Sequence, residues 1–151
     1  MNKGDWQKNP LHKVDILMWQ VIKLMIRNKK QILERFGLTC SQFEIISAIY
    51  HFSRIKTEII QIDLSSRTEI DPMTTSTIVR NLQKKGLVTR HRSVLNTRAI
   101  IVELTQEGLD LFEQALLQVN SWSDLIYQDV NKRYLTTQLL KLFDKLNKLN
   151  Y

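Results

Sequence analysis

The sequence predicts a mainly α-helical domain that carries one small β-ribbon. Apolar residues recur at helical spacing through most of the 151 residues. Four Gly and two Pro in the whole chain leave little room for long loops. Two short runs with partial β-type alternation, 87–90 and 98–104, follow each other in the second half. A chain of this length can build one domain with a sizeable core.

The first two helices are predicted from their apolar spacing and their ends. The first covers 10–36, and its apolar stripe is wide for a solitary surface helix. We therefore expect it to contact its own core on one side and another surface on the other. Gly37 suits the left-handed position just past a helix end. Thr39 and Gln42 fit a capping box, which predicts that a second helix starts here and ends near Ser53.

A short amphipathic segment, 59–67, precedes the helix whose start and end are marked most clearly in the sequence. Asp71 is a strong N-cap and Pro72 stands at the first helical position, where its missing N–H costs nothing. Gly86 closes the helix. A short helix, a tight turn and a capped helix form a helix-turn-helix layout, and the following ribbon would be a wing. The ribbon's turn, 93–96, is polar with an apolar tip.

The last two helices repeat apolar residues in steps of three and four. Thr105 caps the first of them. The repeated positions are Phe112, Ala115, Val119, Trp122 and Ile126, then Leu135, Leu139, Leu142, Leu146 and Leu149. One interpretation is a helical hairpin within the chain, and the other is a dimer interface. We favour the dimer because unmatched apolar stripes mark interfaces.

The positive charge is concentrated in one segment. The chain has a net charge of +7, and residues 67–98 hold seven basic side chains against two acidic ones. Such a cluster suits phosphate binding, although a solvated basic face explains the charge equally well. The order of the elements favours DNA, because the first residues of the second helix of a helix-turn-helix meet base edges in the major groove. Small hydroxyl side chains occupy those positions, where they are poor helix formers.

The predicted DNA-binding residues belong to this segment. They are Arg67, Met73, Thr74, Thr75, Ser76, Thr77, Arg80, Asn81, Lys84, Arg90, Arg92, Asn96 and Arg98.

The order of motifs resembles the multiple-antibiotic-resistance regulator (MarR) family. The resemblance is carried by Leu38-Thr39 with Gln42-Phe43, Leu82-Gln-Lys-Lys-Gly86-Leu87-Val-Thr-Arg90, Asn96-Thr-Arg98, Val102-Glu-Leu-Thr105 and Glu107-Gly108. It implies a mainly α winged helix-turn-helix fold, a six-helix dimer. Residues 1–36 and 105–151 would form the dimerisation region, and 37–104 the DNA-binding region.

The resemblance also implies that the recognition helix enters the major groove and the wing the adjacent minor groove. Arg98 matches the wing arginine of the family's Asp-x-Arg signature. Asn96 departs from it, because the family usually has Asp there, although an amide can still accept a hydrogen bond. Ser93 and Val94 replace the usual Asp-Pro turn.

Members of this family often bind small aromatic ligands. Trp19, Phe36, Phe43 and Tyr50 could line such a pocket, although aromatic residues at helical spacing more often form ordinary core. Cys40 is the only cysteine. A helix N-terminus lowers a thiol pKa, but no resolving partner is visible, and we favour a structural role for Cys40.

Catalysis, cofactors and metal binding are not expected. The three histidines, His12, His51 and His91, are widely separated, and no nucleophile elbow, phosphate loop or paired carboxylate motif occurs. Residues 1–10 lack the apolar core of a signal peptide. No run approaches the roughly 18 to 20 apolar residues of a membrane span. These features favour a cytoplasmic protein.

The sequence as a whole indicates a homodimeric regulator that binds a pseudo-palindromic operator in duplex DNA, as a ligand- or stress-responsive repressor. The alternative is a winged-helix module that contacts another regulator, in the manner of an antirepressor. The altered wing turn at Asn96 permits this alternative. The basic surface opposes it, since a module that only contacts proteins has no need for such charge.

Overall fold

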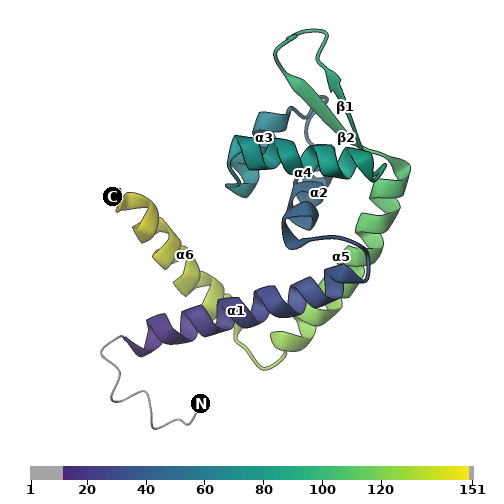
Figure 1. Ribbon diagram of the computed structural model, residues 1–151. Helices are drawn as coiled ribbons and strands as arrows, with labels where there is room; N and C mark the ends of the chain where they lie inside the picture. The colour runs from purple at the N-terminus through teal and green to yellow at the C-terminus, as the bar shows by residue number, and fades with distance from the viewer. Residues whose placement is uncertain (1–11, 150–151) are drawn as a thin grey trace. The chain divides into compact units, whose positions relative to one another are not determined.

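The computed structural model describes residues 12–149, which form six helices and one two-stranded antiparallel sheet (Figure 1). In chain order the elements are α1 (Lys13–Glu34), α2 (Cys40–Phe52), α3 (Gln61–Thr68), α4 (Pro72–Lys84), β1 (Val88–Arg92), β2 (Ile100–Leu104), α5 (Gln106–Ile126) and α6 (Lys132–Lys148). The chain divides into two compact units, one ending at Ala115 and one beginning at Leu116, so α5 passes from the first to the second. The predicted mainly α fold with one small β-ribbon is confirmed.

The helix ends follow the local chemistry of the sequence. Thr39 Oγ1 accepts a hydrogen bond from the backbone N of Gln42 at 3.1 Å, and Gln42 Oε1 accepts one from the backbone N of Thr39 at 3.1 Å. This is the predicted capping box. Asp71 Oδ1 accepts from the backbone N of Thr74 at 2.9 Å, with proline at the first helical position. Gly86 has a φ of +75°, as a glycine just past a helix end requires.

Some boundaries differ from the prediction. The first helix begins at Lys13, and Pro10 and Leu11 lie outside the described residues. The strands run over 88–92 and 100–104 rather than 87–90 and 98–104. Arg92 is paired with Ile100, and beyond this pair the backbone closes a turn, which places residue 98 in the turn instead of the strand.

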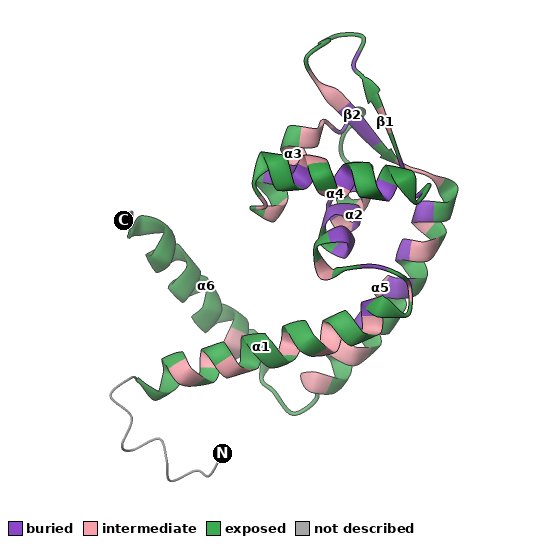
Figure 2. Cartoon of the chain, viewed as in Figure 1, coloured by how far each residue is buried: buried purple, intermediate pink, exposed green. Residues whose placement is uncertain are grey.

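The core of the first unit is centred on α2. This helix packs against α1, α3, α4 and β2, and its buried residues include three isoleucines (Figure 2). Phe112, from α5, is almost completely buried, and its ring lies 5.3 Å from that of Phe43 and 5.0 Å from that of Tyr50, between centroids. An aromatic cluster therefore joins the start of α5 to α2.

The second unit contains the rest of α5 and all of α6. The side chain of Asn131 caps α6 by accepting from the backbone N of Tyr134 at 3.0 Å. None of the residues of α6 is buried, and its exposed large apolar side chains are Tyr134, Leu139, Leu140, Leu142, Phe143 and Leu146. Among residues 12–149, no helix is both long and apolar enough to cross a membrane.

Candidate nucleic-acid interface

The turn between α3 and α4 is fixed by three hydroxyl groups. Ser65 Oγ donates to the backbone oxygen of Ile70 at 2.6 Å, and Thr75 Oγ1 donates to the same oxygen at 3.2 Å. Thr68 Oγ1 donates to the backbone oxygen of Leu64 at 2.7 Å. The first two bonds connect the last turn of α3 to the first turn of α4 through the oxygen of Ile70, and the third lies within α3. They fix the orientation of α4, the second helix of the helix-turn-helix, relative to α3.

The α4 helix has one buried and one exposed face. Thr75, Val79 and Leu82 follow one another at steps of four and three and are all fully buried. The structure therefore corrects the prediction for Thr75, which we placed among the base-contacting residues. Its side chain points into the core and its hydroxyl is already bonded to the turn, so it cannot reach DNA. The periodicity of 3.6 residues per turn decides this, not the residue type.

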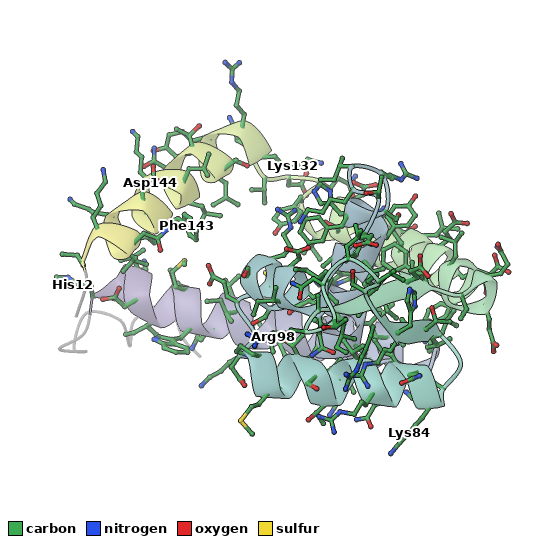
Figure 3. The ribbon with its side chains drawn as sticks, turned by 90° about the horizontal axis from the view of Figure 1, so that it is seen from above. His12, Lys84, Arg98, Lys132, Phe143 and Asp144 are labelled. Carbon is green, nitrogen blue, oxygen red and sulfur yellow. The ribbon has the colours of Figure 1, made fainter. Side chains whose placement is uncertain are left out.

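The opposite face of α4 carries the other predicted residues of this helix. Met73 is 82% exposed, at the start of the helix. Ser76 is half-buried and accepts a hydrogen bond from Arg80 Nη2 at 2.9 Å. The remaining exposed members are Thr74, Thr77, Arg80, Asn81 and Lys84. Figure 3 shows the Lys84 side chain extending from the end of the helix. Apart from Met73 this row is polar or basic, and nothing in the first unit covers it.

The wing turn is closed by its own hydrogen bonds. Asn96 Oδ1 accepts from the backbone N of Arg98 at 3.2 Å, so this bond involves the Arg98 backbone and not its guanidinium. Ser93 Oγ accepts from the backbone N of Leu95 and of Asn96, both at 3.2 Å. Asn96, Arg98 and Pro72 line one cavity of about 300 Å³, so the wing turn lies beside the start of α4 (Figure 3). The wing arginine and the exposed face of α4 thus belong to one surface.

The basic residues of β1 and α3 differ in their availability. Arg67 and Arg92 are exposed. Arg90 is half-buried, and its Nη2 donates to Gln61 Oε1 at 3.4 Å. Its guanidinium therefore connects the wing to the start of α3, and it is less available for phosphate than we predicted. Gln61 was not singled out from the sequence, because nothing local in the chain marks it as a partner of β1.

Lys85 is a second residue that sequence reasoning missed. Its Nζ donates to the backbone oxygen of Gly37 at 2.6 Å and to Gln42 Oε1 at 3.2 Å. The ammonium group therefore ties the end of α4 to the turn between α1 and α2. Its partners lie more than 40 residues away in the sequence, so only the folded structure reveals this contact.

The N-cap of α4 has a distinctive electrostatic character. The hydrogen bonds from Thr74 hold the pKa of the Asp71 carboxyl below its ordinary value of 3.8, because they stabilise the charged form. A negative charge at a helix N-terminus is also favourable toward the helix dipole. Asp71 thus stabilises the start of α4, whereas the basic residues around it are candidates for contact with DNA.

The residues considered for sensing are dispersed in the structure. Phe43 is buried and Tyr50 half-buried, and both rings pack against Phe112, so they form part of the core. Trp19 is exposed on α1, and Phe36 is half-buried after its end. Among the described residues, no three His, Cys, Asp or Glu side chains gather as a metal site would require.

Comparisons with known proteins agree with this geometry. The model of the MarR family matches residues 38–100, which span α2 to the wing. Over this segment the chain is similar to the MarR family. It is 28% identical to the HTH-type transcriptional regulator YdcH of Bacillus subtilis over 100 residues, covering 66% of this chain and 68% of that one.

Solved structures share the fold of this chain. A complex of Staphylococcus aureus MepR with DNA has a TM-score of 0.79 at 21% identity, covering 92% of this chain and 100% of that one. CouR from Rhodococcus jostii RHA1, bound to p-coumaroyl-CoA, has a TM-score of 0.74 at 17% identity, covering 92% and 94%. At these identities the likeness establishes a common architecture.

Proposed function

We propose that this chain is a transcription regulator that binds duplex DNA sequence-specifically. The observation that carries the proposal is the single surface formed by the exposed face of α4 and the wing turn with Arg98. The row from Met73 to Lys84 would lie in the major groove, where the hydroxyl and amide groups of Ser76, Thr77 and Asn81 can pair with base edges. Arg98 would reach the adjacent minor groove.

The charges around this row would position the protein on the phosphates. Arg67, Arg80, Lys84 and Arg92 are all exposed in the same segment. Each phosphate that a basic side chain neutralises releases counterions, so affinity should fall steeply as salt rises. Arg90 would contribute less than these four, because it is already bonded to Gln61.

Selection from a randomised duplex library tests the proposal. The whole protein is expected to enrich a pseudo-palindromic sequence whose half-sites are about one helical turn apart. Exchange of Ser76 for Ala should change the preferred bases. No enrichment over several rounds at low salt would refute DNA binding, and would favour the alternative of a module that contacts another regulator.

We also propose that the protein is a homodimer held by α1 and by the last two helices. Leu17, Trp19 and Ile22 leave apolar surface exposed on α1, and residues along α6 line an apolar groove of about 410 Å³. Unpaired apolar surface of this kind marks an interface. Sedimentation equilibrium tests this with Leu142→Gln against the neighbouring control Lys141→Gln. The first should weaken the dimer and the second should not; equal behaviour would contradict the proposed interface.

The remaining parts of the proposal follow from the relatives. MepR is solved with DNA and CouR with p-coumaroyl-CoA, which supports a small effector for this chain and a role without catalysis. We propose that the protein represses transcription, since an operator-bound dimer blocks access to a promoter. We also propose that it acts in the cytoplasm. A reporter gene behind the selected duplex should be silenced by the protein; a rise in its expression would contradict repression.

A further inference from the structure

The tip of the wing carries two apolar side chains that the fold does not use. Val94 is 92% exposed and Leu95 is 88% exposed, and these are the two most exposed large apolar residues among the described part of the chain. Turns usually contain Gly, Pro, Asn, Asp or Ser, because these residues suit turn geometry or bond their own backbone. A branched apolar pair does neither, so the fold gives no reason for it.

The backbone beneath the tip is held in place. Ser93 is 3% exposed, and its Oγ accepts from the two backbone N–H groups that follow the tip's first residue, both at 3.2 Å. The backbone N of Ser93 donates to the oxygen of Ala99 at 3.0 Å, and the backbone N of Ala99 donates to the oxygen of Asn96 at 2.8 Å. The tip is thus presented on a closed loop, which reduces the entropy lost when it meets a partner.

The surroundings of the tip indicate which partner it meets. Arg92 and Arg98 are exposed on the two sides of the turn, and the base of the turn adjoins Pro72 at the start of α4. One carboxylate, that of Glu58, lies at the base of the turn and accepts from Ser93 Oγ at 3.4 Å. The two arginines outnumber it, so a polyanion is the partner that the surrounding charges favour. The tip is also continuous with the proposed DNA surface, and apart from Met73 the neighbouring exposed face of α4 is polar or basic, which suits DNA better than a lipid surface or an apolar protein.

We propose that Leu95, supported by Val94, enters the minor groove as an apolar wedge and partly unstacks one base step outside each half-site. The inference rests on the proposed DNA-binding function and deepens it. Proteins that insert apolar side chains between bases kink the duplex toward the major groove. Pyrimidine–purine steps, TA and CA/TG, are the easiest to kink, so we expect one of them at the position that faces the wing. The tip would then determine specificity without any hydrogen bond to a base.

Fluorescence of 2-aminopurine tests the wedge. The probe is the duplex that the whole protein selects from a randomised library, with 2-aminopurine replacing adenine at successive positions outside the recognition-helix contacts. Wild-type protein should raise the fluorescence at one position per half-site, because unstacking relieves quenching. The double variant Val94→Ser, Leu95→Ser should remove this rise and bind roughly tenfold more weakly. Its salt dependence should stay unchanged, because no charge is altered.

The matched control is Ile55→Ser, which replaces another exposed apolar residue, 64% exposed, in the connection between α2 and α3. It should leave both affinity and fluorescence unchanged. Circular dichroism should be the same for all variants, since the replaced side chains have little buried surface.

The outcomes separate the wedge from DNA binding itself. If the wild type selects and binds a duplex but the fluorescence stays flat, or if the double variant binds like the wild type, the wedge is overturned and DNA binding stands. If the double variant alters only the sedimentation of the protein without DNA, the tip is a contact between copies and the wedge is again overturned. If no duplex is selected, the proposed function fails and the wedge fails with it.

Discussion

Thr75 and Ser76 are adjacent hydroxyl residues that we expect to behave oppositely when changed. Thr75→Val keeps the branched shape of a fully buried side chain and removes one hydrogen bond, of 3.2 Å, to the oxygen of Ile70. That oxygen retains the shorter bond from Ser65, of 2.6 Å. A net hydrogen bond contributes about 0.5–1.5 kcal/mol, and we expect the lower half of this range because the acceptor stays satisfied.

The expected loss of about 0.5–1 kcal/mol corresponds to a fall in Tm of roughly 1–4 °C for a chain of this size. Ser65→Ala should cost more, since it removes the shorter bond. The double variant of Ser65 and Thr75 should cost more than the sum of the two, because the oxygen of Ile70 then loses both side-chain donors. Thermal unfolding followed by circular dichroism measures all three.

Ser76→Ala supplies the contrast. Ser76 is on the accessible side of α4 and bonds Arg80, so its loss should leave Tm nearly unchanged and alter the base preference of selected duplexes. Thr75→Val should leave that preference as it is. A change of base preference in the Thr75 variant without loss of stability would refute the orientation of α4 described above.

Three further predictions concern the scaffold and the wing. Gly108→Ala should destabilise the protein by more than about 3 kcal/mol, because a Cβ atom there would lie 2.0 Å from the backbone oxygen of Leu87. The control Gln114→Ala, on the exposed side of α5, should leave the stability unchanged when both variants are compared by thermal unfolding. Asp71 should stabilise the protein fully above pH 3.8 and lose this contribution as the pH falls through its lowered folded-state pKa, since protonation weakens its bonds from Thr74. The difference in unfolding free energy between wild type and Asp71→Asn should therefore shrink on acidification. A difference that grew instead would contradict the role of Asp71 as the helix cap. Arg98→Ala should lower the magnitude of the slope of log affinity against log salt by about one unit in anisotropy titrations, because one cation at the minor groove is lost; an unchanged slope would exclude contact between the Arg98 guanidinium and the DNA.

Features set by local chemistry could be predicted from the sequence. The capping box of Thr39 and Gln42, the Asp71 cap and the stop at Gly86 each depend on residues a few positions apart, so short-range reasoning identified them. The order of short helix, turn, capped helix and ribbon then determined the architecture.

Features that depend on long-range packing could not be predicted in this way. Thr75 and Ser76 have the same chemistry, and only the packing of α4 on its core decides which hydroxyl is buried. The Arg90 side chain is held by a hydrogen bond to Gln61 of α3. The Lys85 side chain bonds the backbone oxygen of Gly37, which is 48 residues away in the sequence. The ends of the strands differ from the predicted ends for a similar reason. The turn after Arg92 is closed by hydrogen bonds across the turn, which the spacing of apolar residues does not reveal.

We propose that α4 and the wing form one sequence-specific DNA surface. The most direct test of this proposal is an anisotropy titration of the whole protein with its selected duplex and with a scrambled duplex of equal length and composition, over a series of salt concentrations. The protein should bind the selected duplex at least about a thousandfold more tightly, with an affinity that falls steeply as salt rises. Equal affinity for both duplexes at every salt concentration would contradict the proposal.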